Sequence, residues 1–170
     1  MSQDENIPEA PAPEYARFDS EAGFQAAVDK LLAQNGRELR IFDPNLEALR
    51  PNAPARIESL RAFLAANRAH RIFIVLHDPD HVTRFCARLM NLLALYGHAI
   101  RIHQTSEGIR QLQDGFLVMD KCHYVRRPVA RFYRGACGFF DEDEALAMHS
   151  RFMEIWDVSY PAVSSTTSGL

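Results

Sequence analysis

The stretch RIFIVL, residues 71–76, decides the fold class. Apolar and β-branched side chains fill it almost without interruption, which is typical of a strand that is covered on both faces. The residues that follow, HDPD at 77–80, end the run with a proline and with carboxylates that favour turns and helix starts. We therefore expect residues 71–76 to form a central strand of a sheet.

Strands and helices alternate around this run. Residues 38–42 and 99–103 read as strands, and Asp43-Pro44 ends the first of them, because proline disfavours helical geometry in the residue before it. Apolar side chains recur at helical spacing in residues 24–32, 57–64 and 82–96. A strand-helix-strand-helix-strand order requires right-handed crossovers, so it predicts a parallel core.

The pattern changes after residue 112. Residues 115–119, 122–126 and a segment that ends at Phe140 are closely spaced and strand-like, so we expect antiparallel or mixed pairing there. The acidic run 141–144 precedes apolar residues at helical spacing, and acidic side chains are favourable in a first helical turn. The predicted class is α/β, with a mixed, largely parallel central sheet and helices on both faces.

The composition indicates one domain, because the chain has 170 residues with 47% hydrophobic and 24% charged side chains. No apolar segment is long enough to span a bilayer, and the first residues lack the parts of a signal peptide. The three cysteines include no Cys-x-x-Cys pair, which favours buried thiols in a reducing compartment over disulfides or a zinc knot. We expect a cytoplasmic protein that does not contact membranes.

The two ends of the chain differ in composition from the middle. Residues 1–16 are acidic and rich in proline, and residues 160–170 are small and hydroxylated, so we expect a disordered arm and a flexible tail around a folded domain at 17–159. The arm contains four acidic and no basic side chains, so without it the net charge changes from −3 to +1. Because the rest of the chain is nearly neutral, its net charge does not indicate binding to nucleic acid, and nucleic acid stays an unfavoured partner.

The segment HDPDH, residues 77–81, contains four potential metal ligands. His77, Asp80 and His81 are the candidates for a zinc or manganese site. The alternative is structural, since Asp78 is a favourable N-cap, the proline suits the first helical position and Asp80 complements the helix dipole. Capping explains three of the five residues without an ion, so we predict no metal and no other cofactor.

A second cluster is basic. Residues 121–140 contain no acidic side chain, and Phe132 and Tyr133 lie among the basic ones. The basic residues are Lys121, Arg126, Arg127, Arg131 and Arg134. Such a stretch can bind phosphate groups or stack on bases. Since the chain has 17 arginines and 2 lysines, a solvated face or pairing with the following acidic run explains the cluster as well.

The order of elements resembles one repeat of the phospholipase D superfamily over residues 18–158. The matching features are Asp43-Pro44 and His77-Asp78-Pro79 after the first two strands, the hairpin FLVMDK at 116–121 and FMEIW at 152–156 in the last helix. This family carries His-x-Lys-x4-Asp on the hairpin strand, where the histidine attacks phosphorus and the lysine binds phosphate. Here the three places hold Gln113, Gly115 and Asp120.

The resemblance implies a phospholipase D-like single repeat without phosphodiesterase activity, because an amide cannot form a phosphohistidine and glycine cannot neutralise phosphate. The chain looks closer to an uncharacterised bacterial domain family related to phospholipase D folds. Our leading hypothesis is a non-catalytic domain that binds a small phosphate-containing ligand or a protein at the rim of the former active site.

This rim is expected at the carboxyl ends of the strands, where open α/β sheets bind ligands. The candidate ligand-binding residues are Asp43, His77, Asp78, His103, Gln104, Gln113, Asp120, Arg126, Arg127 and Arg131. Two alternatives stay open. In the first, a metal- or histidine-dependent hydrolase uses relocated residues such as His77, His81 or His103. In the second, the domain is a homodimeric adaptor, since single-repeat members of the superfamily pair across the cleft.

Overall fold

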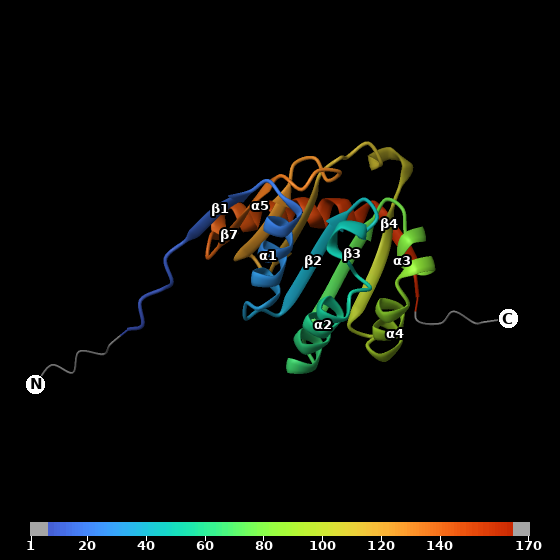
Figure 1. Cartoon of the computed structure of the whole chain (residues 1–170), viewed down its shortest axis with the longest axis horizontal. Coiled ribbons are helices and arrows are strands. Elements are labelled where there is room, and N and C mark those ends of the chain that lie inside the picture. Colours follow the sequence, from blue (N-terminus) through green and yellow to red (C-terminus); the bar gives the residue numbers. More distant parts are fainter. Residues whose placement is uncertain (1–6, 165–170) are drawn as a thin grey trace, which may run out of the picture.

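The computed structural model describes residues 7–164, which form a sheet with helices on both faces (Figure 1). Eight strands in this part of the chain lie in the order β1-β7-β6-β5-β2-β3-β4-β8. The strands are β1 (Glu14–Phe18), β2 (Glu38–Asp43), β3 (Arg71–Leu76), β4 (Ile100–Thr105), β5 (Gly115–Met119), β6 (His123–Arg127), β7 (Gly135–Phe139) and β8 (Ser159–Val163). The RIFIVL run is β3, and it lies between β2 and β4 as a central strand should.

Parallel pairing is confined to the three strands that helices connect. β2, β3 and β4 pair in parallel, whereas the other five strand pairs among the described residues are antiparallel. The α/β class with a mixed sheet is confirmed, but the sheet is not largely parallel, and that part of the expectation is corrected. β5, β6 and β7 follow one another through connections too short for a crossover, so they must run antiparallel.

The helices divide between the two faces of the sheet. They are α1 (Glu21–Leu32), α2 (Pro54–Ala66), α3 (Asp80–Phe85), α4 (Ala87–Leu95) and α5 (Glu142–Asp157). α1, α2 and α4 cover one face, and α5 runs across the other (Figure 1). Ser20 caps α1, since its Oγ accepts the N–H of Gly23 at 3.1 Å. The apolar segment 82–96 forms two helices, because the backbone leaves helical geometry at Cys86.

Both edges of the sheet are strands that the sequence patterns missed. β1 begins at Glu14, inside the predicted arm, and β8 ends at Val163, inside the predicted tail. Each pairs with one neighbour, β1 with β7 and β8 with β4, so backbone pairing orders them with little apolar burial. Regular structure therefore extends beyond 17–159 at both ends. Residues 1–6 of the arm and 165–170 of the tail lie outside the described residues.

Residues 7–164 bear on two expectations from the sequence, which concern membrane-spanning segments and the state of the cysteines. No helix in this range is long and apolar enough to cross a bilayer. Cys86 and Cys137 are buried and Cys122 is half-buried, and all three are free thiols. Burial raises the pKa of each thiol, so none has the character of an activated nucleophile.

Buried histidines make the fold sensitive to acid, and His123 is the clearest case. It is 3% exposed, and its Nδ1 accepts the backbone N–H of Phe140 at 3.1 Å. Burial lowers the pKa of His123 below 6.5, against a smaller opposing effect of Asp120. The unfolded chain therefore binds a proton at pH values where the folded chain does not. The contribution of His123 to stability is complete at pH values above its unfolded-state pKa. This contribution is lost as the pH falls from there through the folded-state pKa of His123.

We expect His123→Asn to weaken this acid dependence, because the Asn side-chain oxygen can replace Nδ1 as acceptor and does not titrate. Urea unfolding at about pH 7.5 and about pH 5.5 should show that the wild type loses more stability between the two values than the variant does. Burial also lowers the pKa of His103 and His149, and these account for the remaining loss. An equal loss in both proteins would contradict this role of His123.

Candidate ligand-binding rim

Three strand ends and one hairpin meet at one end of the sheet, which we call the rim. β2, β3 and β4 end there, and the hairpin sets Gly115, the first residue of β5, opposite Arg127, the last residue of β6. Because β2 and β5 run antiparallel, Asp43 at the end of β2 lies next to Gly115. This is the end of the sheet at which we expect a ligand from the sequence.

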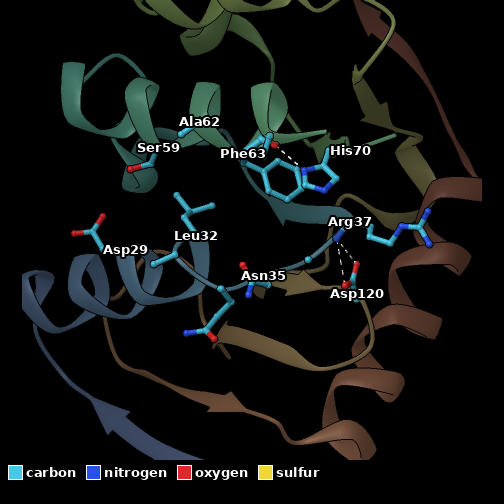
Figure 2. Close-up of a pocket in the computed structure, with 13 residues that line it drawn as sticks. Asp29, Leu32, Asn35, Arg37, Ser59, Ala62, Phe63, His70 and Asp120 are labelled. Atoms are coloured by element: carbon cyan, nitrogen blue, oxygen red, sulfur yellow. Dashed lines mark hydrogen bonds between the residues drawn. The ribbon is translucent and has the colours of Figure 1, made fainter. Parts of the chain in front are cut away.

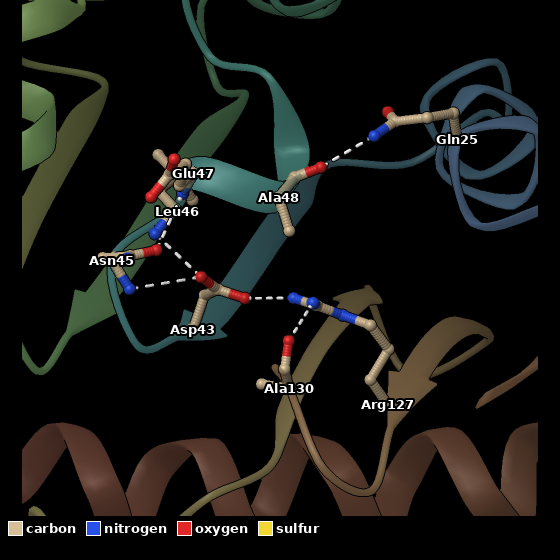
Figure 3. Close-up of polar contacts among 8 residues, drawn as sticks. All are labelled: Gln25, Asp43, Asn45, Leu46, Glu47, Ala48, Arg127 and Ala130. Atoms are coloured by element: carbon tan, nitrogen blue, oxygen red, sulfur yellow. Dashed lines mark hydrogen bonds and ion pairs between the residues drawn. The ribbon is translucent and has the colours of Figure 1, made fainter. Parts of the chain in front are cut away.

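Asp43 and Arg127 form a buried ion pair at the rim (Figure 3). Each is 2% exposed, and Nη2 of Arg127 donates to Oδ1 of Asp43. Oδ2 of Asp43 accepts the backbone N–H groups of residues 45 and 46 at 3.2 and 2.7 Å. Nη1 of Arg127 donates to the carbonyl of Ala130, and the guanidinium carbon lies 4.4 Å from the ring centroid of Phe24. Every side of the pair therefore contacts protein.

The contacts within the pair use up its hydrogen-bonding capacity toward a ligand. Burial raises the pKa of Asp43 and lowers the pKa of Arg127, and the attraction between the two charges opposes both shifts. A buried carboxylate needs donors for both oxygens, and Asp43 has them. The two side chains thus neutralise each other instead of facing outward together.

Gly115 provides the space that this ion pair occupies. A Cβ atom on Gly115 would lie 3.0 Å from Oδ1 of Asp43, and 3.3 Å from both Cβ of Ala130 and the carbonyl oxygen of Phe42. A lysine at this motif position would therefore meet the pair before it met a phosphate. Gln113, at the histidine position of the motif, is exposed, and its backbone carbonyl accepts the N–H of Ala130 at 2.7 Å.

Hydrogen bonds fix both ring nitrogens of His77. Nε2 donates to the carbonyl of Leu112 at 2.7 Å, because a carbonyl can only accept, and Nδ1 then accepts the hydroxyl of Thr105 at 2.6 Å. The side chain of Gln104 donates to the His77 carbonyl at 3.2 Å. His77 thus connects the end of β3 to the last residue of β4 and to the segment before β5.

A pocket of about 360 Å³ opens at the rim beside His77, and we call it the rim pocket. Its lining consists of Pro44, His77, Leu112, Gln113, Val129 and Arg131. Three of the predicted residues thus come together here. Arg131 is exposed, and its guanidinium carbon lies 4.7 Å from the ring centroid of Phe132. It forms no ion pair with a carboxylate of residues 7–164.

Three predicted residues lie away from the rim pocket. Asp78 is exposed, and its Oδ1 accepts the N–H of Asp80 at 2.9 Å, but α3 begins one residue later than predicted, so Pro79 and not Asp78 is its N-cap and that part of the expectation is corrected. His103 lies on the α5 face and stacks on Trp156, with 3.6 Å between the ring centroids. Asp120 lies at the other end of β5, where its carboxylate accepts the N–H groups of residues 37 and 38. The length of β5 separates Asp120 from the rim.

The HDPDH segment gathers no ligand set around an ion. Within residues 7–164, no group of three or more histidine, cysteine or carboxylate side chains is arranged to hold a metal. The ring of His81 packs against Phe85 instead, with 5.7 Å between the centroids. The described part of the chain therefore offers no cluster in support of the hydrolase alternative.

A second hollow adjoins the rim pocket at Val129, and we call it the arginine groove. It has a volume of about 310 Å³ and is lined by Tyr15, Arg17, Arg126, Pro128, Val129, Phe132, Arg134, Gly135 and Ala136. Its three arginines are exposed, and none forms an ion pair with a carboxylate of the described chain. Tyr15 and Phe132 are 59% and 47% exposed, and the lining contains no acidic residue.

Sequence reasoning selected Arg126 but missed Tyr15 and Arg17. β1 carries both missed residues, and its pairing with β7 sets Arg17 opposite Ala136, which itself pairs with Arg126. The three residues in this cross-strand row therefore point to the same face of the sheet. In EYARF, residues 14–18, apolar and polar side chains do not alternate strictly, so no clear local signal for a strand was available.

A larger cavity, about 700 Å³, lies between α1 and α2 at the end of the sheet opposite the rim (Figure 2). Several of its polar groups are already engaged. Asp29 is in an ion pair, and Asp120 accepts the N–H of Arg37 (Figure 2). His70 stacks on Phe63 at 4.7 Å, and its Nδ1 bonds to the Phe63 carbonyl at 2.7 Å. Few polar groups remain there to orient a ligand.

Comparison with known proteins supports the fold. The model of a family described as Domain of unknown function (DUF7931) matches residues 20–165. No curated protein sequence matches the chain. Among solved structures, Nuc, a phospholipase D family member from Salmonella typhimurium, is 15% identical, with a TM-score of 0.61 over 90% of this chain and 100% of that chain.

Two further structures have the same fold. NucT from Helicobacter pylori is 9% identical, with a TM-score of 0.60 over 89% of this chain and 100% of that chain. TrmBL2, an archaeal chromatin protein with a novel mode of DNA binding, is 12% identical, with a TM-score of 0.62 over 92% of this chain and 56% of that chain. At such low identities the likeness concerns the fold alone, and it confirms the expected phospholipase D-like fold.

Proposed function

Since the chain belongs to the DUF7931 family and has a phospholipase D-like fold, we propose that it is a non-catalytic domain that binds a phosphate-containing ligand at the rim, namely single-stranded nucleic acid in the arginine groove. The observation that carries this proposal is the lining of the groove. It combines three guanidinium groups that form no ion pair within residues 7–164 with two exposed aromatic rings, and the lining contains no carboxylate.

The residues at the rim support the non-catalytic part of this proposal. The nucleophile position holds Gln113, and the phosphate-binding position holds Gly115, whose side-chain space is taken by Asp43. Both ring nitrogens of His77 are hydrogen-bonded to protein groups, Thr105 and the Leu112 carbonyl. On this proposal the rim lacks the groups that attack phosphorus and neutralise phosphate.

Single-stranded nucleic acid fits the groove better than an isolated phosphate does. Several exposed arginines can follow a chain of phosphates, while exposed rings such as Tyr15 and Phe132 offer stacking surfaces for bases. The near-neutral body gave no charge argument for nucleic acid, but folding gathers Arg17, Arg126 and Arg134 on one surface without acidic neighbours. The DNA binding of TrmBL2, a protein with a similar fold, agrees with this proposal.

Binding of a fluorescent oligothymidylate of about 12 nucleotides, followed by fluorescence anisotropy, tests the proposal. We expect saturable binding that weakens steeply with salt, because phosphate contacts release counterions. Arg126→Gln should weaken binding about threefold to tenfold and reduce the salt dependence, and the triple variant Arg17→Gln/Arg126→Gln/Arg134→Gln about a hundredfold. Phe132→Ala should weaken binding about tenfold through lost stacking.

Arg68→Gln is the matched control, because Arg68 is also exposed but lies outside the groove. This variant should bind the oligonucleotide like the wild type. The proposal fails if the wild type does not bind at low salt, or if the triple variant and Arg68→Gln bind equally well. Circular dichroism of each variant verifies that the fold is intact.

A further inference from the structure

A separate pocket at the opposite end of the sheet contains a buried arginine with unused donors. It has a volume of about 430 Å³ and is lined by Arg37, Glu38, Arg40, Ala69, Asp120, Lys121 and His149. We call it the Arg40 pocket. The start of β2, the β5–β6 turn and α5 supply most of this lining, so the pocket is distinct from both hollows at the rim.

Arg40 is 8% exposed, yet two of its three guanidinium nitrogens lack acceptors. Nη2 donates to Oε2 of Glu38 at 2.7 Å, whereas Nε and Nη1 are shielded from solvent and have no hydrogen-bond partner. The guanidinium carbon lies 5.1 Å from the ring centroid of Phe73, which accounts for its position but supplies no conventional acceptor. Buried charged donors are normally paired, so the unused donors of Arg40 indicate a missing acceptor.

The charges around Arg40 favour an anion as that acceptor. Lys121 is exposed and forms no ion pair within the described chain, and Arg37 also lies in the lining without a carboxylate partner there. The carboxylate of Asp120 is engaged with backbone N–H groups. Glu38 accepts a hydrogen bond from Arg40. The lining therefore contains three basic side chains, those of Arg37, Arg40 and Lys121, and two carboxylates that already accept hydrogen bonds.

His149 completes the lining from α5. Burial, followed by the positive charges of Arg40 and Lys121, lowers the pKa of His149, while Glu38 and Asp120 oppose this effect. The pKa of His149 thus depends on Arg40 and Lys121, the same basic side chains that would bind an anion. A bound anion would offset those cations and stabilise the protonated ring, which makes His149 a local reporter of occupancy.

We propose that the Arg40 pocket binds the phosphate group of a small phosphorylated molecule. The phosphate would accept hydrogen bonds from the guanidinium group of Arg40, whose side chain lines the pocket, and from Nζ of Lys121, with His149 on the α5 side. Phosphate suits the site because its several oxygens can accept from donors on different elements at once, and because guanidinium and ammonium groups both bind it well. A volume of about 430 Å³ leaves room for a small organic part.

Titration of the full chain with inorganic phosphate, followed through the histidine side-chain signals in two-dimensional NMR, tests this inference. We expect saturable shifts of the His149 signals and a higher apparent pKa of His149 when phosphate is bound. Lys121→Gln should weaken phosphate binding about tenfold by removing one charge-assisted hydrogen bond. Arg40→Gln should abolish it, but Lys121→Gln is the decisive variant because its exposed side chain leaves the core untouched.

Lys30→Gln is the matched control, since Lys30 lies on α1 and pairs with Glu14 away from the pocket. It should bind phosphate like the wild type. A His149 response that does not saturate, or equal affinity in Lys121→Gln and wild type, would overturn the inference. Acetate should bind at least about tenfold more weakly, and equal affinity would overturn the assignment to phosphate. Arg17→Gln should leave the His149 response unchanged, which separates this site from the arginine groove.

Discussion

Replacing Arg127 by methionine is expected to lower the free energy of unfolding by about 3–5 kcal/mol, because the substitution leaves the Asp43 carboxylate buried without its charged partner. Asp43 is 2% exposed, so water cannot replace the lost donor without opening the rim. The variant also loses the hydrogen bond to the Ala130 carbonyl and the contact with the Phe24 ring. Urea unfolding at neutral pH, monitored by circular dichroism, measures the change.

The double variant Asp43→Asn/Arg127→Met shows whether the unpaired charge is responsible. The Asn oxygen can still accept the N–H groups of residues 45 and 46, while the buried negative charge is gone. We expect the double variant to recover much of the stability that Arg127→Met loses. Arg126→Met, at the exposed neighbouring position, should change stability by less than about 0.5 kcal/mol. A double variant as unstable as Arg127→Met would contradict this account.

The central elements could be predicted from local sequence because their signals are local. β3 is an unbroken apolar run, and the helix start of α5 follows from a block of acidic residues ahead of apolar side chains at helical spacing. The hairpin β5–β6 is similarly visible, since five strand-like residues precede Asp120 and Lys121. In these cases the residues that determine an element lie within it or beside it.

The edge strands could not be predicted in this way. In β1 all residues except Phe18 are exposed, so EYARF has little apolar content to distinguish it from a flexible arm. What orders β1 is backbone pairing with β7, whose residues lie more than 100 positions later in the chain. β8 depends in the same way on β4. The arginine groove stayed hidden for this reason, because two of its lining residues, Tyr15 and Arg17, depend on the placement of β1.

The rim could be located from sequence, but the state of its charged residues could not. Asp43 and Arg127 both have the character of ligand-binding groups, and nothing local indicates that residues 84 positions apart form an ion pair. Asp120 is a similar case, because the sequence shows that it follows β5 but not which end of β5 lies at the rim. The hairpin places Gly115 at the rim and Asp120 beside the start of β2. Strand direction, a tertiary property, decides both outcomes.

The ion pair leads us to expect that two substitutions in the motif would not produce phosphodiesterase activity. Gly115 and the Asp43–Arg127 pair are coupled, since the carboxylate lies where a side chain at position 115 would begin. The added lysine would then place a third charge against a pair that is already neutral. Restoring His-x-Lys-x4-Asp by Gln113→His/Gly115→Lys is therefore expected to give no phosphodiesterase activity and to reduce stability by about 1–3 kcal/mol through overpacking.

Hydrolysis of bis(p-nitrophenyl) phosphate and urea unfolding of Gln113→His, Gly115→Lys and the double variant test this expectation. Gln113→His should keep the stability of the wild type, because position 113 is exposed and its carbonyl bond to Ala130 does not involve the side chain. The loss should appear only with Gly115→Lys. Turnover by the double variant would show that a lysine can pass Asp43 and reach a bound phosphate, and the rim would then be a dormant active site. A stable but inactive double variant would instead mean that the lysine is accommodated away from the rim, and that the ion pair blocks chemistry without being displaced.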